Sequence, residues 1–308
     1  VEARPRQIAR VSVEGWLRAG RAGEWPHPQF PFGQYSDDTQ LARELLRSYL
    51  ESSGWSAPAF AARLATLFRE GRDVGAGPGT RSAALRLDSG VPWNESGTPG
   101  PYAGNGAAMR AGPLGLLLPE RGAMCRAARE QATITHLDPR CAAGAVAVAR
   151  AVAIASGRGS IDNSSFLEDL AGCAAAADRS VAEAIRDLSE WLPLSPERAA
   201  HHVHESGLDP AHKDGWRGIS AFITPSVLWS LYAFLRSPDD YWETVCTAIG
   251  VGGDTDTMAA IAGAISGARL GVEALPKGLV ARLNDRGEWG AGALVELAYS
   301  CAAVVESP

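Results

Sequence analysis

The chain has 308 residues, 46% of them hydrophobic and 21% charged, so it could form one large domain or two average ones with a substantial core. Its formal net charge of −6 argues against a general nucleic-acid binder, which normally carries a basic patch. The sequence contains no run of about 18 apolar residues that would predict a membrane span, and its start lacks the apolar core of a signal peptide.

The N-terminal 35 residues predict little regular structure. Residues 8–17 form a short amphipathic piece. Three closely spaced prolines, Pro26, Pro28 and Pro31, then forbid a helix. Because the chain begins at Val1 without Met, we expect a preceding segment to have been removed or left out.

Helical periodicity begins at Asp37, where Leu41, Leu45 and Tyr49 recur on one face and predict a helix over 37–51. Ala-rich segments bounded by glycine or proline predict further helices over 57–70, 122–132, 140–157, 163–175, 178–191, 221–236, 239–249, 256–270 and 291–305. Alternating β-branched runs are almost absent, so extended sheet has little support. We predict an all-α fold, a compact orthogonal multi-helix bundle that forms a single domain over 1–308.

Two stretches, 71–80 and 88–106, are crowded with Gly, Pro, Ser and Asn and interrupt the predicted helices. Loops of this length in a compact domain are usually functional or disordered.

The cysteines are scattered, mostly among Ala and Val, and contain no Cys-x-x-Cys pair; they are Cys125, Cys141, Cys173, Cys246 and Cys301. This pattern favours buried thiols in a reducing cytosol.

Two acidic segments have the same make-up, Ser36-Asp37-Asp38-Thr39 and Asp254-Thr255-Asp256-Thr257. Each presents carboxylates and hydroxyls at the start of a predicted helix, and such oxygen ligands suit Mg²⁺, Mn²⁺ or Ca²⁺ rather than Zn²⁺. The simpler interpretation, an N-cap, fits the first segment better than the second, whose helix is apolar on nearly every face. If the fold joins the two segments, four unpaired buried carboxylates would be so costly that cations would be required.

Two weaker patterns stay open. The segment 102–110 places Asn105 between glycines and leads into an Ala-rich segment, which alone is no better than a helix-entry turn. The run His201-His202-Val203-His204-Glu205 puts His201 and His204 or Glu205 on one helical face, as a zinc site would. A solvated polar face is the commoner explanation of such a run.

Taken in order, four motifs resemble the ADP-ribosylglycohydrolases, which include the dinitrogenase reductase activating glycohydrolase and the ADP-ribosyl-acceptor hydrolases. The motifs are Ser36-Asp37-Asp38-Thr39-Gln40, Gly104-Asn105-Gly106-Ala107-Ala108-Met109-Arg110, Thr135-His136 and Gly252-Gly253-Asp254-Thr255-Asp256-Thr257. The resemblance covers about positions 1–270. It implies an all-α fold with two divalent cations, Mg²⁺ or Mn²⁺, that hydrolyses the bond between ADP-ribose and an acceptor.

The resemblance also implies roles for single residues. The metal ligands would be Ser36, where the family more often has Thr, together with Asp37, Asp38, Asp254, Asp256 and Thr257. The substrate-binding positions would be Gly75, Gly77, Gly79, Tyr102, Gly104, Asn105, Gly106 and His136. Within this set, 75–80 resembles a loop whose backbone N–H groups hold a pyrophosphate, and Asn105 resembles a ribose contact. Trp93, Tyr102 or Trp216 could stack on adenine.

One departure concerns the N-terminal side. Family members begin with a helix carrying Gly-Asp-Ala-x-Gly, followed by Pro-x-Glu with a metal-proximal or catalytic Glu. We expect this chain to lack that helix, with Glu2 as the counterpart of the Glu and Glu14 as a weaker candidate. Asp38 and Glu2 are then the residues expected to handle the proton.

The resemblance thus predicts a cytoplasmic, dinuclear metal-dependent hydrolase that cleaves the N- or O-glycosidic bond between ADP-ribose and a protein or small-molecule acceptor. The alternative is a catalytically inactive ADP-ribose or nucleotide-binding protein on the same scaffold. A magnesium-dependent phosphohydrolase is disfavoured because no Gly-x4-Gly-Lys-Ser/Thr loop is present.

Overall fold

The computed structural model describes residues 15, 18, 30–157, 159–208 and 215–306. Regular structure in this part of the chain is helical, and extended segments pair only through isolated bridges. The α-helices are α2 (Asp37–Glu51), α3 (Ala57–Arg69), α4 (Pro78–Asp88), α5 (Leu114–Leu117), α6 (Arg121–Thr133), α7 (Pro139–Ser156), α8 (Asn163–Ala174), α9 (Arg179–Trp191), α10 (Pro196–Glu205), α11 (Ile223–Arg236), α12 (Tyr241–Gly250), α13 (Thr255–Leu270), α14 (Lys277–Val280) and α15 (Ala291–Val305). Two short 3₁₀-helices, η1 (Asn105–Ala107) and η2 (Val272–Ala274), complete them.

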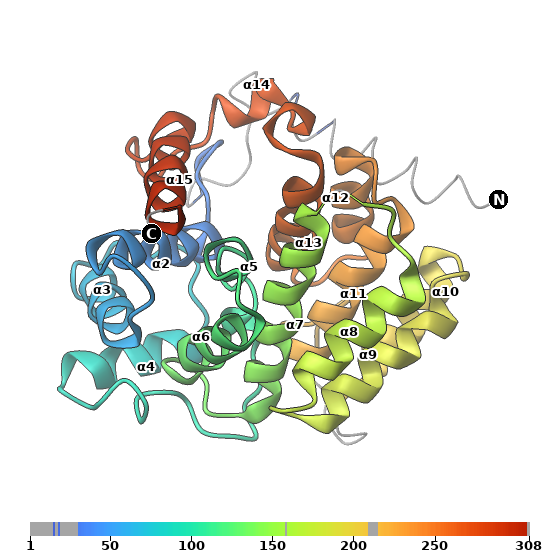
Figure 1. Ribbon diagram of the computed structural model, residues 1–308, viewed down its shortest axis with the longest axis horizontal. Helices are drawn as coiled ribbons and strands as arrows, with labels where there is room; N and C mark the ends of the chain where they lie inside the picture. Colours follow the sequence, from blue (N-terminus) through green and yellow to red (C-terminus); the bar gives the residue numbers. More distant parts are fainter. Residues whose placement is uncertain (1–14, 16–17, 19–29, 158, 209–214, 307–308) are drawn as a thin grey trace.

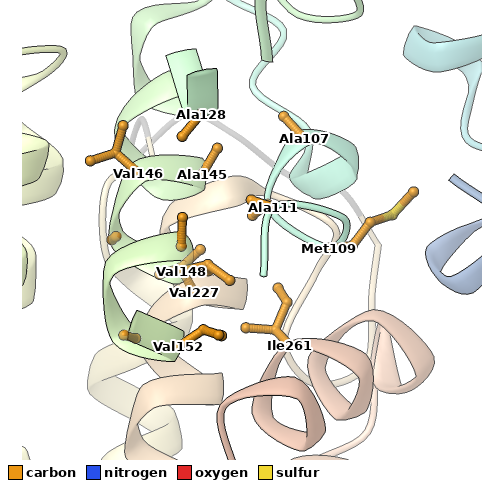
Figure 2. Packing of buried hydrophobic residues seen from close by; sticks show 14 of the residues in the cluster. Ala107, Met109, Ala111, Ala128, Ala145, Val146, Val148, Val152, Val227 and Ile261 are labelled. Carbon is orange, nitrogen blue, oxygen red and sulfur yellow. The ribbon is translucent and has the colours of Figure 1, made fainter. Parts of the chain in front are cut away.

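Helix α7 lies at the centre of the bundle, with α2 to α6 on one side of it in Figure 1 and α8 to α11 on the other. Its many alanines and valines allow neighbours to approach closely, and at Gly144 an added Cβ would lie 2.6 Å from the Ile223 side chain. Figure 2 shows Val148 and Val152 of this helix packed among Val227 and Ile261. Alone among the described helices, α7 is long and apolar enough to suit a membrane span, and 61% of it is buried inside the protein.

The structure confirms every helix predicted from the sequence, with each end within two residues of its predicted position. The five cysteines are buried, as predicted, and form no disulfide within the described residues. The prediction for 71–80 is wrong at its end, because α4 starts at Pro78, and proline is well tolerated in the first turn of a helix. The helices α4, α5, α10 and α14 were not predicted. Pro31 is described and lies outside any helix, as predicted, whereas Pro26, Pro28, Glu2, Glu14 and nearly all of 8–17 lie outside the described residues.

A buried polar network fixes α2 against two distant segments. Gln40 Nε2 donates to Arg72 O at 2.9 Å and to the Asp285 carboxylate at 2.9 and 3.0 Å, while Gln40 Oε1 accepts from Val74 N at 2.9 Å. Arg43 Nη1 donates to Asp285 Oδ2 at 2.7 Å, and the Asp285 side chain is almost fully buried. The network therefore holds the loop that follows Arg72 beside the first turn of α2.

We expect Asp285→Asn to lower the free energy of unfolding by about 3 kcal/mol at pH 7, because it leaves a buried guanidinium incompletely compensated. Burial alone would raise the pKa of Asp285, but hydrogen bonds from Arg43, Gln40 and Gln34 outweigh it and hold this pKa below its ordinary value. A depressed folded-state pKa stabilises the protein above the ordinary Asp pKa of about 3.9, and the contribution is lost as pH falls through the folded value. Urea unfolding from pH 7 to pH 3 should show the difference shrink.

The control is Glu288→Gln, which breaks the exposed pair between Glu288 and Arg72. Exposed pairs contribute about 1 kcal/mol or less. Equal losses in the two variants, or a loss for Asp285→Asn that does not change with pH, would contradict the role given to the network.

Candidate metal centre and adjoining cleft

The first turns of α2 and α13 meet, although they come from opposite ends of the chain. The Asp38 carboxylate accepts a hydrogen bond from Ser36 Oγ at 2.6 Å and another from the Thr257 hydroxyl. The side chains of Asp37, Asp38 and Thr257 are all buried. Asp256 raises the pKa of both Asp37 and Asp38, so the two acidic segments lie within electrostatic reach of each other.

Burial, together with the charges of neighbouring aspartates, raises the pKa values of Asp37, Asp38 and Asp254. Burial, followed by the charges of Asp38, Asp256 and Asp254, raises the pKa of Asp37 to about 8. Burial and Asp256 raise the pKa of Asp38 to about 6, against the hydrogen bonds from Ser36 and Thr257. Burial raises the pKa of Asp254 to about 7, opposed by a hydrogen bond from Asn105 and assisted by Asp256. Interacting buried carboxylates of this kind are typical of functional sites.

The oxygen chemistry of this cluster fits a hard divalent cation. Asp38 Oδ1 is buried and has no hydrogen-bond partner within the described structure. Carboxylate and hydroxyl oxygens are the donors that Mg²⁺ and Mn²⁺ prefer. No group of three His, Cys, Asp or Glu side chains among the described residues is arranged as a ready-made metal site. Two features therefore favour a cation here: the donors are oxygens, and several carboxylates lie close together.

Backbone and amide contacts position Asp254. Asn105, buried in η1, donates through Nδ2 to Asp254 Oδ2 at 2.7 Å and to Ser226 Oγ at 3.0 Å. The Asp254 N–H donates to Ile219 O at 2.8 Å, within a bridge between Ile219 and Gly253. Gly253 has φ +88°, and a Cβ there would collide with the Ile219 backbone. Glycine is therefore required at this position before α13.

An aromatic pair lies beside η1. The Tyr102 ring stacks on His136, with 5.9 Å between ring centroids and 12° between planes. A Cβ at Gly79 would collide with the Tyr102 ring, and a Cβ at Gly104 would lie 3.1 Å from His136 Nε2. These glycines let two backbone segments approach the rings closely.

The loop at 75–80 connects this aromatic pair to the aspartates. Gly75 has φ +81°, and a Cβ there would lie 3.7 Å from Asp37 Oδ1. Gly79, near the other end of the loop, lies under Tyr102, and a Cβ at Gly106 would lie 3.0 Å from Thr80 Oγ1. The candidate substrate-binding segments are therefore neighbours of the candidate metal ligands.

A short chain of polar contacts holds His136. Arg110 Nη2 donates to Thr135 Oγ1 at 2.7 Å, and Thr135 Oγ1 lies 2.8 Å from His136 Nδ1, in a hydrogen bond whose donor depends on the tautomer. Burial, followed by the Arg110 charge, lowers the pKa of His136 to about 3. His136 is therefore neutral at neutral pH.

Sequence reasoning missed Arg110, although it ends one of the four motifs. Its side chain is fully buried, and burial lowers its pKa to about 9, which leaves it charged at neutral pH. Its position at the end of an Ala-rich segment was the available signal, because a charged residue among small apolar ones needs partners.

The structure places the other predicted residues as follows. Around Asp38 it gathers Ser36, Asp37, Asp254, Asp256 and Thr257. Gly77, in contrast, borders open space. Of the three aromatic candidates, Tyr102 adjoins His136, Trp93 packs against the core, and Trp216 lines a different recess. No group of metal-binding side chains occurs among the described residues, so nothing in this part of the chain supports a zinc site at the histidine run.

Comparison with known proteins gives consistent matches. The family profile described as ADP-ribosylglycohydrolase matches residues 1–306. The chain is 29% identical over 279 residues to ADP-ribosylhydrolase ARH3 of Homo sapiens, covering 79% of this chain and 72% of that protein. It is 27% identical over 285 residues to ADP-ribosyl-[dinitrogen reductase] glycohydrolase of Rhodospirillum rubrum, covering 91% and 80%. A solved structure described as ADP-ribosylglycohydrolase-related protein complex has the same fold, with a TM-score of 0.63, 24% identity and coverage of 89% and 81%.

We expect Gly79→Ala to lower the free energy of unfolding by about 1–3 kcal/mol, because the new methyl group must displace Tyr102 from its packed position. Gly77→Ala is the matched control in the same loop, since its φ is −69° and nothing lies within 4 Å of the added methyl. That change should stay within about 0.5 kcal/mol. Urea unfolding measures the free energy of unfolding of both variants. Equal losses would show that the packing of Tyr102 does not require glycine at position 79.

Proposed function

We propose, on the premise that this chain belongs to the ADP-ribosylglycohydrolase family and hydrolyses glycosyl bonds, that it removes ADP-ribose from an acceptor with the help of two divalent cations. The observation that carries the proposal is the meeting of Asp37 and Asp38 with Asp254 and Asp256 at two helix starts. If these carboxylates had only a structural role, their mutual repulsion would destabilise the fold with nothing to offset it.

The cations would be Mg²⁺ or Mn²⁺, held by six residues: Ser36, Asp37, Asp38, Asp254, Asp256 and Thr257. Bound there, they would neutralise the carboxylates and supply a water of lowered pKa. Asn105 has a positioning role in this arrangement, because its amide already donates to Asp254 Oδ2 and Ser226 Oγ.

The residues around Tyr102 and His136, which we call the proposed cleft, would hold the rest of ADP-ribose by contacts of three kinds. The segment 75–80 leads into the N-terminus of α4, where unpaired backbone N–H groups favour a pyrophosphate. Tyr102, which is 40% exposed, would contact the adenine with the exposed part of its ring. His136 would donate from Nε2 towards ribose oxygens near Gly104 and Gly106 in the tautomer whose Nδ1 accepts from Thr135.

Proton handling falls to Asp38. One of its carboxylate oxygens is fixed by Ser36, while Oδ1 is buried without a partner in the described structure. A carboxylate so placed could take the proton of the attacking water as positive charge develops at C1″ of the ribose. Glu2, the second predicted acid, lies outside the described residues and stays a prediction.

We propose as substrates either an ADP-ribosylated protein or an ADP-ribose-containing small molecule in the cytoplasm. One relative acts, by its name, on ADP-ribosylated dinitrogen reductase. The buried cysteines accord with a reducing compartment.

Asp254→Ala should reduce release of ADP-ribose by on the order of 10³-fold, which corresponds to about 4 kcal/mol of lost transition-state stabilisation. Excess EDTA should do the same to the unaltered protein, and Mg²⁺ or Mn²⁺ should restore it. Chromatographic measurement of free ADP-ribose gives the rate. The control is Asp239→Ala, whose exposed carboxylate pairs with Arg269 on the surface. Undiminished hydrolysis in excess EDTA would contradict the proposed role of the metal.

Incubation with ADP-ribosylated arginine and serine peptides, followed by mass spectrometry, tests the bond that is cleaved. We expect one of the two peptides to lose ADP-ribose in the presence of Mg²⁺, and Asp38→Asn to bind that peptide without releasing its ADP-ribose, because an amide cannot accept the proton of the attacking water. Binding of both peptides with no release from either would favour an inactive ADP-ribose-binding protein.

A further inference from the structure

A second recess, of about 490 Å³, opens between α10, α12 and the segment 216–219. Its size falls in the range of small-molecule sites. Among the described residues, none of the candidate metal ligands or cleft residues lines it. Ile219 forms part of its wall and, through its bridge to Gly253, separates it from the aspartates.

The floor of the recess is apolar and rigid. Trp229, Ile219 and Cys246 line it and are almost fully buried. The Trp229 ring stacks on Tyr232 with 4.8 Å between centroids, and its Nε1 donates to Ala248 O at 3.2 Å. The indole is therefore held beneath the recess, almost fully buried, and closes its apolar floor.

One polar atom inside the recess lacks a partner. Thr247 lines it, is 5% exposed, and its Oγ1 makes no hydrogen bond within the described structure. A buried hydroxyl left in this state is destabilising by about 1–3 kcal/mol. Thr244, one turn earlier on α12, is paired as buried hydroxyls usually are, because its Oγ1 donates to Ser237 O at 2.9 Å. Thr247 is therefore available to a ligand.

The rim carries planar rings and little charge. His201 and His204 line it from α10, together with Trp216, whereas His202 stacks on Trp191 with 5.6 Å between centroids. Two histidines of the run noted in the sequence, His201 and His204, thus line the recess, and His202 packs against Trp191. Of the described residues that line the recess, Glu197 is the charged one and none is Lys or Arg, which disfavours phosphate or carboxylate ligands.

We propose that this recess binds an uncharged nitrogen heterocycle of nucleobase or nucleoside size. Its ring packs beside Trp216 and the two histidines at the rim, above the apolar floor. Its polar edge bonds to Thr247 Oγ1, which satisfies the buried hydroxyl.

The test is a titration of adenosine, cytidine and nicotinamide into protein labelled with 5-fluorotryptophan. The ¹⁹F signal of Trp216 is assigned with the variant Trp216→Phe. We expect at least one compound to shift this signal saturably. Thr247→Val should weaken its binding about tenfold while leaving stability unchanged or raised, because the hydroxyl has no partner to lose. Ala200→Phe, which fills the recess, should abolish the shift.

The matched control is Thr244→Val, which should lower stability and leave the affinity unchanged, since its hydroxyl is paired elsewhere. Tyr102→Ala should also leave the shift unchanged, which separates this recess from the cleft beside His136. No saturable shift with any of the three compounds, or equal affinity in Thr247→Val, would overturn the proposal. Equal affinity for adenosine and AMP would overturn the restriction to uncharged ligands.

Discussion

The structure depends on carboxylates of like charge brought together where α2 and α13 begin. Asp37, Asp38 and Asp254 all have raised pKa values, and Asp256 contributes to each shift. Repulsion between ionised groups is strong where water is largely excluded. With pKa values of about 8, 6 and 7, Asp37, Asp38 and Asp254 are partly protonated near pH 7. Under our proposal, cations would replace these protons and remove the repulsion.

Two kinds of support keep the aspartates in place without neutralising them. On the α2 side, Gln40 ties the helix to the backbone of the loop before Gly75 and to Asp285. On the α13 side, Asn105 and the Ile219 carbonyl hold Asp254 through an amide and a backbone contact. A site built on two rigid helices in this way is preorganised for its ligand.

The helices could be predicted because Ala-rich periodicity is a local property, and the aspartates because their motif is compact. Helix α4 could not, since glycines and a proline at its start read as a loop. Arg110 and Asp285 were missed for a different reason, because their partners lie far away in the sequence. The pairing of Ile219 with Gly253 depends on backbone atoms that every residue shares, so residue type could not reveal it.

The central claim is that the meeting point of α2 and α13 binds divalent cations. Crystals grown with Mn²⁺ and measured near the manganese absorption edge test it most directly. We predict two anomalous peaks between the Asp37–Asp38 carboxylates and those of Asp254 and Asp256, both absent from Asp254→Ala crystals. A map without peaks there, at a Mn²⁺ concentration that supports hydrolysis in solution, would contradict the account.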